Sequence, residues 1–100
     1  MKIIVTPAAE AELLEIGLWI AEDDPVRAQS FMDELRQVCS RLTDAPRAYP
    51  LIERYKRSGI RRRIYRDYLI FYRVALEQID ILHILHGARD YEVILAQELE

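Results

Sequence analysis

"IRRRIYRDYLIFYRVALEQIDILHILH", residues 60–86, decides the fold of this chain, because three short runs rich in β-branched and aromatic residues follow one another in it. The runs span residues 60–65, 68–75 and 79–86. Arg66-Asp67 connects the first two runs and Glu77-Gln78 the last two, and connections this tight join antiparallel neighbours. The segment therefore predicts three strands, each paired antiparallel with the next.

The last of these strands is expected to lie inside the sheet. Strict alternation places Ile79, Ile81 and Leu85 on one face and Leu82 and Ile84 on the other. A strand with apolar residues on both faces is covered on both sides. We therefore expect the run 79–86 to be a central strand.

The N-terminal half predicts a short strand and a helical hairpin. "KIIV" at 2–5 has β-branched composition, and Thr6-Pro7 after it supplies a helix N-cap and a first-turn proline. Asp24-Pro25 repeats the device. Apolar residues at helical spacing follow each start: Ala9, Leu13, Ile16 and Ile20, then Ala28, Phe31, Leu35, Val38 and Leu42. The link between the two helices is so short that they must run antiparallel.

The complete order is β-α-α-β-β-β, with a loop at 43–50 and weak helical spacing after residue 90 that allows a short last helix. This order predicts an α+β fold in which a helical hairpin packs on a small, mainly antiparallel sheet. One hundred residues are expected to form a single domain, residues 1–100.

Composition indicates a compact chain of the cytoplasm. Hydrophobic residues make up 51% and charged residues 31%, which is ordinary for a folded protein. No apolar block is long enough to span a bilayer, and the N-terminus has no signal-peptide core. The lone Cys39 cannot form an intramolecular disulfide. We expect a cytoplasmic protein that does not bind membranes.

Charge is distributed unevenly. The net charge of −3 argues against a protein that coats nucleic acid through its whole surface, and no direct nucleic-acid specificity is expected. The first 24 residues hold six acids and one base, whereas residues 54–73 hold eight bases and one acid. The asymmetry suits an acidic partner segment, a phosphate, or pairing between the two halves of the chain.

Residue types that would signal catalysis or a metal site are poorly placed. His83 and His86 are three apart on a predicted strand, so they face opposite sides and cannot bind one ion. Ser30, Ser40 and Ser58 lack the context of an activated nucleophile. We therefore predict no catalytic residue, no metal site and no cofactor.

"IRRRIY" places arginines where core residues are expected. Arg62 shares a face with Ile60 and Ile64, whereas Arg61 and Arg63 share the other face. Buried arginine is costly unless a carboxylate or phosphate pairs with it. One explanation is pairing with acids of the hairpin such as Glu12 and Glu15. The other is a basic groove for an acidic peptide, RNA phosphates or an acidic protein patch.

Three stretches in this order resemble the ParE-type toxins of the RelE/ParE toxin–antitoxin superfamily. They are "TPAAEAELLEIGLWIAEDDPVRAQSFMDEL" at 6–35, "SGIRRRIYRDYLIFYRV" at 58–74 and "ILHGARD" at 84–90. The resemblance covers nearly the whole chain. It implies a type II toxin neutralised by a cognate antitoxin, whose C-terminal segment would wrap the hairpin and lie along the sheet.

Members of the superfamily differ in activity. RelE-like members cut mRNA in the ribosome with basic residues and a tyrosine, whereas ParE-like members poison DNA gyrase. In register with the RelE-like pattern, Arg89 falls on a basic position and Arg62 falls near another, but the remaining positions hold Ile60, Leu69 and Leu95. Aliphatic side chains neither accept a proton nor stabilise a phosphorane. The resemblance therefore favours a gyrase inhibitor that acts by binding.

Two alternatives stay open: a ribosome-dependent mRNA endonuclease, and a protein that has lost toxicity and serves only as corepressor of a DNA-bound antitoxin. For gyrase contact we predict Arg61, Arg62, Arg63 and Arg89. For antitoxin contact we predict Leu13, Ile20, Phe31, Tyr68 and Phe71. "HILHGARDYE" at 83–92 is interpreted as the end of the last strand, with Gly87 as a break and Asp90 as the cap of a helix.

Overall fold

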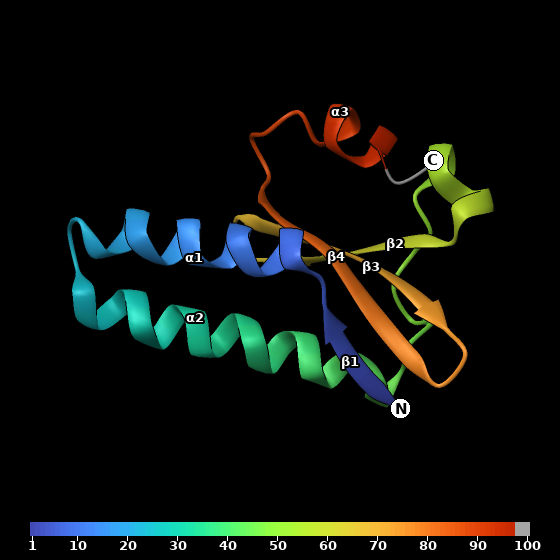
Figure 1. Cartoon of the computed structure of the whole chain (residues 1–100), viewed down its shortest axis with the longest axis horizontal. Helices are drawn as coiled ribbons and strands as arrows, with labels where there is room; N and C mark the ends of the chain where they lie inside the picture. Colours follow the sequence, from blue (N-terminus) through green and yellow to red (C-terminus); the bar gives the residue numbers. More distant parts are fainter. Residues whose placement is uncertain (98–100) are drawn as a thin grey trace.

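The computed structural model describes residues 1–97 and contains every helix and strand that the sequence predicts (Figure 1). The elements are β1 (Lys2–Val5), α1 (Pro7–Ala21), α2 (Pro25–Ser40), β2 (Ile60–Tyr65), β3 (Tyr68–Ala75), β4 (Gln78–His86) and α3 (Tyr91–Ala96), with the 3-10 helices η1 (Arg41–Asp44) and η2 (Glu53–Ser58). The predicted α+β fold class is confirmed. No helix within residues 1–97 combines the length and apolar character needed to cross a membrane.

The sheet has the order β1-β4-β3-β2. β2 pairs antiparallel with β3, and β3 with β4, as the tight connections predict. β1 pairs parallel with β4, so that Lys2 lies opposite Gln78. A parallel pair needs a long crossover, and the intervening helices and strands supply it. β4 therefore lies inside the sheet, as expected.

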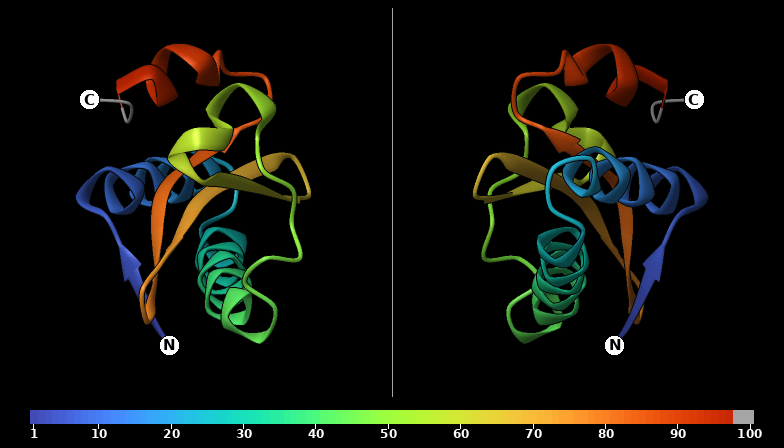
Figure 2. Two further views of the ribbon diagram at one scale, coloured as in Figure 1. Left: turned by 90° about the vertical axis from the view of Figure 1, so that its right-hand side faces the viewer. Right: turned by 90° about the vertical axis from the view of Figure 1, so that its left-hand side faces the viewer.

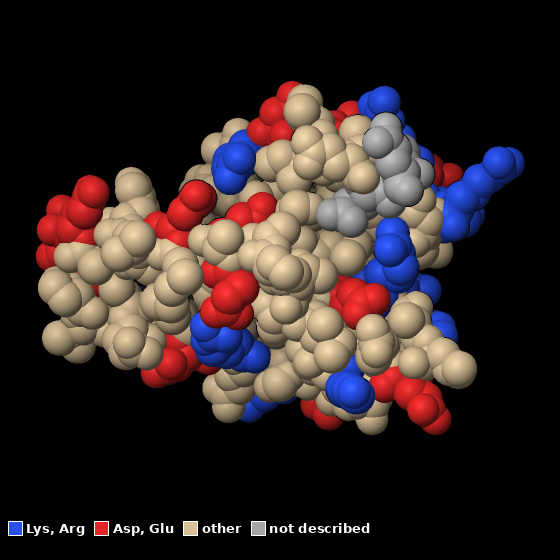
Figure 3. All heavy atoms as spheres, in the orientation of Figure 1, with Lys and Arg blue, Asp and Glu red and all other residues tan. Residues whose placement is uncertain are grey.

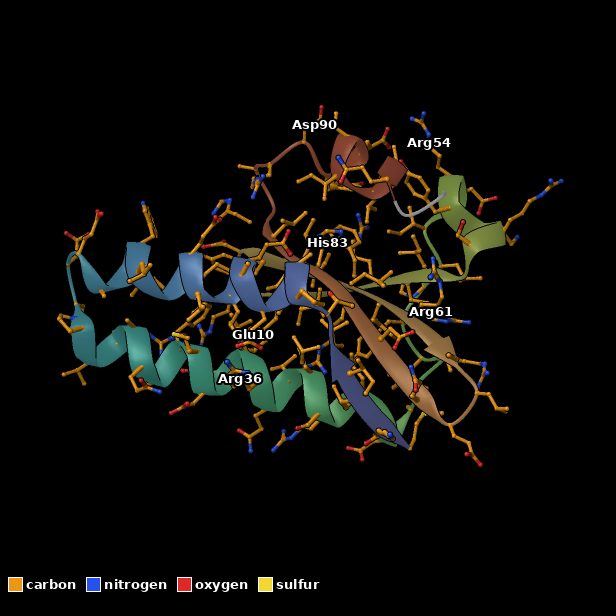
Figure 4. The ribbon with its side chains drawn as sticks, in the orientation of Figure 1. Glu10, Arg36, Arg54, Arg61, His83 and Asp90 are labelled. Carbon is orange, nitrogen blue, oxygen red and sulfur yellow. The ribbon has the colours of Figure 1, made fainter. Side chains whose placement is uncertain are left out.

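The two helices begin where the sequence predicts. The Thr6 hydroxyl accepts the backbone N–H of Ala9 at 3.2 Å, and the Asp24 carboxylate accepts that of Arg27 at 3.0 Å. These caps satisfy N–H groups that have no partner inside the helix. An ion pair of 2.5 Å between Arg36 and Glu10 joins α2 to α1 (Figure 4).

Apolar residues form a core on each face of the sheet. The core on the hairpin side contains Leu13, Phe31, Leu35, Tyr68, Ile70, Tyr72, Ile81 and Ile84. The core on the other side contains Tyr55, Ile60, Leu69, Phe71, Leu82, Leu85 and Leu95. Figure 2 shows α2 on one side of the sheet and α3 with η2 on the other. Both faces of β3 and β4 are thus removed from water. This burial of apolar surface is the main source of the stability of the fold.

A β-bulge reverses the predicted alternation in β4. Tyr72 lies opposite Ile81 and Phe71 opposite His83, so Leu82 is an extra residue without a partner. One extra residue in a strand turns the side chains of all later residues of that strand to the opposite face from the one that strict alternation predicts. Ile84 therefore packs on the hairpin side and Leu85 on the other side. The prediction for these two residues was wrong.

Two local predictions also need correction. Ile64 was expected in the core beside Ile60, but 61% of it is exposed, near the end of the edge strand β2. Asp90 precedes α3, yet its side chain accepts no capping hydrogen bond. Gly87 does follow the end of β4, and its N–H donates to the Asp67 carbonyl at 2.8 Å.

The Cys39 thiol is expected to be unreactive in the folded chain. Cys39 is 3% exposed, and burial raises the pKa of its thiol to about 11. A rise of about two units from the ordinary value leaves roughly a hundredfold less thiolate at neutral pH, and the thiolate is the reacting form. Labelling of Cys39 with a disulfide reagent should be at least about a hundredfold slower in the folded chain than in the chain unfolded in urea. Equal rates would mean that α2 opens readily.

Candidate functional site

The outward face of α1 is apolar. Leu14 is 52% exposed, Leu18 71% and Trp19 67%, and no described residue covers them. Their neighbours Ile16 and Ile20 pack against the hairpin-side core, so α1 carries apolar residues on both of its sides. A contiguous exposed apolar surface on one helix is typical of a site where another protein binds.

A groove runs beside this face, between α1 and the ends of β3 and β4. It has a volume of about 400 Å³ and is lined by Glu15, Ile16, Trp19, Tyr68, His86 and Arg89. We call it the α1 groove. Ile16, Trp19 and Tyr68 make it apolar, whereas Glu15 and Arg89 are exposed and charged. The groove can accept an apolar side chain whose neighbours bond to these charges.

Tyr68 and His86 form one wall of the α1 groove. Their rings meet edge to face with centroids 5.3 Å apart. Burial, and secondly the negative charge of Asp67, raises the pKa of the Tyr68 hydroxyl. The His86 Nδ1 accepts the backbone N–H of Ala88 at 3.1 Å, which holds the turn that leads to Arg89. This wall is therefore neutral at Tyr68 and fixed in place.

Gly17 lets the two helices approach each other directly beneath the exposed face of α1. A Cβ at Gly17 would lie 2.3 Å from the Met32 sulfur on α2, closer than real side chains come. Because Gly17 faces α2, Leu18 and Trp19 in the same turn point away from it. The close helix packing thus determines which residues of α1 remain exposed.

Glu12 fastens α1 to the edge of β4. β1 ends at Val5, so beyond Ile81 no strand within residues 1–97 pairs with this edge of β4. The Glu12 carboxylate accepts the Ile84 backbone N–H at 3.0 Å and the His83 Nδ1–H at 2.8 Å. Figure 4 shows His83 where β4 passes α1. The contact satisfies buried polar groups at a sheet edge, where an unpaired group is costly.

The arginines of β2 do not pair with Glu12 or Glu15, so that explanation was wrong. Arg61 Nη1 donates to the Tyr49 carbonyl at 2.8 Å, and Arg63 lies over the Tyr49 ring at 4.9 Å. Both lie on the hairpin side of the sheet, opposite Tyr72 and Ile70. Alternation along the strand separates them from Arg62, whose Nη1 donates to the Tyr91 hydroxyl at 3.4 Å on the other side.

The four arginines predicted to contact gyrase therefore lie in three places. Arg61 and Arg63 are beside the loop at 43–50, Arg62 is beside α3, and Arg89 is at the α1 groove. Figure 4 shows Arg61 next to β2 and Asp90, the neighbour of Arg89, before α3. The three arginines of β2 are half-buried, whereas Arg89 is exposed.

Most residues predicted to contact the antitoxin are in the cores. Leu13, Phe31, Tyr68 and Phe71 are buried, and Phe71 packs on the opposite side of the sheet from the other three. Only Ile20 is partly exposed. The exposed large apolar residues of α1 are instead Leu14, Leu18 and Trp19, which sequence reasoning missed. Leu14 and Leu18 are four apart on the outward face, and this second apolar stripe could have revealed the surface.

Three of the positions compared above with the RelE-like pattern are occupied by core residues. Ile60, Leu69 and Leu95 are buried together around Phe71 and Tyr55. Their side chains cannot transfer a proton. Within residues 1–97 no three His, Cys, Asp or Glu side chains are grouped so as to hold a metal ion.

Comparison with known proteins gives one family and one fold. The family described as "ParE toxin of type II toxin-antitoxin system, parDE" matches residues 3–91. A chain of the solved structure "Chromosomal ParDE TA system from P. aeruginosa" superposes with a TM-score of 0.72, covering 86% of this chain and 95% of that chain. The two are 19% identical in sequence, so this likeness shows the fold alone. No curated protein matches significantly.

Proposed function

The chain belongs to the ParE toxin family of type II toxin–antitoxin systems, and we propose that it inhibits DNA gyrase by binding and is neutralised by a cognate antitoxin. The observation that carries the proposal is the family match over residues 3–91, on a chain with the fold of a ParDE system. A toxin of this class works as one half of a protein pair, and the exposed face of α1 is a surface that such a partner would cover.

We propose the α1 groove and the adjoining Leu14 and Leu18 as the antitoxin-binding surface. Protein interfaces are built around apolar and aromatic anchors with charged residues at the rim. Trp19 supplies the anchor, and Glu15 and Arg89 supply the rim. The antitoxin segment that fits presents apolar side chains to Trp19 and a carboxylate to Arg89. Ile20, predicted from the sequence, adjoins this surface.

For gyrase contact, Arg89 is the strongest of the four proposed arginines. It is exposed, and no carboxylate among residues 1–97 pairs with it. Because Arg89 also lines the α1 groove, an antitoxin bound there would cover it. Overlap of the two surfaces gives a simple mechanism of neutralisation: the antitoxin occupies what gyrase would contact. Arg61, Arg62 and Arg63 extend the proposed contact along β2.

The proposal is tested with purified chain, refolded free of antitoxin and mixed with gyrase, ATP and relaxed plasmid. We expect loss of supercoiling and accumulation of linear DNA as the chain is added. A parallel reaction with ribosomes and a message serves as the control for the ribonuclease alternative, and the message should stay intact. Normal supercoiling at an excess of folded chain would refute gyrase inhibition.

Arg89→Glu should raise the dose needed for half-inhibition of gyrase about tenfold, the effect of losing roughly 1.4 kcal/mol of binding at one charged contact. The substitution is exposed and should leave the thermal unfolding midpoint unchanged. Lys2→Glu is the matched control, because it makes the same charge change on the exposed edge strand β1. Equal doses for the two variants would remove Arg89 from the target surface.

A further inference from the structure

Charge is strongly separated along this chain. Residues 41–73, which we call the basic region, hold ten Lys and Arg and three acids, whereas the rest of the chain holds four bases and fourteen acids. The basic region comprises η1, η2, β2 and most of β3. Figure 3 shows blue side chains over the end of the molecule that carries η2 and β2, and red ones at the tip of the α1–α2 hairpin.

Most of the positive charge in the basic region is not neutralised. Arg54 pairs with Glu92, and Arg66 pairs with Glu34. Among residues 1–97, no carboxylate comes within 4.0 Å of the other eight bases, which are Arg41, Arg47, Lys56, Arg57, Arg61, Arg62, Arg63 and Arg73. These bases lie around the edge strand β2, with Arg61 and Arg63 on the hairpin side of the sheet and Arg62 and Arg73 on the other side. An anionic partner along this edge would relieve the repulsion between neighbouring positive charges.

Backbone carbonyls hold two of these guanidinium groups in place. Arg73 Nε donates to the Ser58 carbonyl at 2.7 Å, and Arg61 Nη1 donates to that of Tyr49 at 2.8 Å. A carbonyl orients the guanidinium but carries no net charge, so the positive charge remains. Side chains that are already ordered lose little entropy when they bind. Lys56 and Arg57, directly before Ser58, are exposed and add further positive charge next to the residue that holds Arg73.

The basic region lacks the apolar anchors of a protein interface. Of the large apolar residues that are exposed within 1–97, only Ile64 lies in it, whereas Leu14, Leu18 and Trp19 lie on α1. Protein interfaces have apolar, charge-depleted centres, whereas nucleic-acid interfaces are polar and strongly positive. The two surfaces of this molecule therefore suit two different kinds of partner.

We infer that the basic region binds the phosphate backbone of duplex DNA without reading its sequence. The inference deepens the proposed function and rests on it for the choice of DNA, because an inhibitor seated on gyrase would lie beside the duplex that gyrase holds. Phosphate contacts position a protein on DNA and carry no base information. This agrees with the expectation that the chain has no nucleic-acid specificity of its own.

The test measures binding of the purified chain to a short fluorescent duplex by anisotropy, from low to physiological salt, with no gyrase present. The double variant Lys56→Gln/Arg57→Gln should bind the duplex about tenfold more weakly at low salt. The slope of log affinity against log salt concentration should become less steep by about 1.8, because each lost phosphate contact removes about 0.9 from the slope. Ala8→Glu/Val26→Glu is the matched control. It lowers net charge by the same two units in the first turns of α1 and α2, where carboxylates favour the helix.

The inference is overturned if the chain fails to bind duplex at low salt, or if the two double variants give the same slope. Polyglutamate of equal charge is added as a competitor. If it displaces the chain as well as unlabelled duplex does, the partner is an acidic protein and the assignment to DNA fails. Gyrase inhibition is measured separately. If supercoiling is normal but duplex binding depends on the basic region, only the proposed function is refuted. If the chain inhibits gyrase but does not bind duplex, only this inference is refuted.

Discussion

Glu12→Ala is expected to lower the free energy of unfolding by about 3 kcal/mol, a large part of what holds a domain of this size together. The carboxylate accepts two hydrogen bonds at the open edge of β4, from the Ile84 N–H and from His83. His83 is buried, so bulk water cannot replace the Glu12 carboxylate as its hydrogen-bond partner.

Chemical denaturation measured by circular dichroism gives the size of this effect. Glu15→Ala is the control, because Glu15 is exposed on the same helix and its loss should change stability by less than about 0.5 kcal/mol. Glu12→Gln keeps an acceptor for the Ile84 N–H but removes the charge. Its free energy of unfolding should therefore lie between those of Glu12→Ala and Glu15→Ala. If Glu12→Ala and Glu15→Ala are equally stable, the edge of β4 does not depend on this carboxylate.

Trp19→Glu is expected to weaken the complex with the cognate antitoxin by about 3 kcal/mol, roughly a 150-fold rise in Kd. Trp19 is the largest exposed apolar side chain of α1 and lines the α1 groove. A carboxylate there replaces the aromatic anchor and would have to be desolvated against the apolar part of the antitoxin. The fold should be kept, because 67% of Trp19 is already exposed to water.

Titration of the purified toxin with antitoxin, followed by calorimetry, measures the change. Val26→Glu is the matched control: it places the same charge at an apolar residue that is 82% exposed, at the start of α2 and outside the groove. Co-expression in cells should give the corresponding result, with Trp19→Glu remaining toxic where the wild-type chain is neutralised. Unchanged affinity for Trp19→Glu would show that the antitoxin binds another face.

The local signals of this sequence were sufficient for its α-helices and strands, but the 3-10 helices η1 and η2 were not predicted. Thr6-Pro7 and Asp24-Pro25 start the helices, and tight connections define the strand pairs, at 66–67 as predicted and at 76–77, one residue before the predicted 77–78. Each of these signals acts within a few residues. The parallel pairing of β1 with β4 and the bulge at Leu82 have no such signal, because they arise when distant segments meet.

The candidate site was harder to predict for a related reason. Three consecutive arginines look like one cluster in the sequence, but a strand sends Arg62 to the opposite side from Arg61 and Arg63. Only one apolar face of α1 was identified from the sequence, although α1 has more apolar residues than one face can bury. Glu12 gave no sign of its contact with β4, since its partners lie more than 70 positions away.

The pairing of β1 with β4 also determines the order in which this protein takes shape during synthesis. Lys2 lies opposite Gln78, and at about 5–20 residues per second the 76 residues from Ile3 to Gln78 take roughly 4–15 s to be added. Until β4 leaves the ribosome, the first strand has no neighbour and α1 has no sheet beneath it. The helices with Leu14, Leu18 and Trp19 are therefore translated well before the arginine-rich strand is in place. An antitoxin that recognises this part of α1 can meet the toxin on the nascent chain, before there is a finished molecule to neutralise.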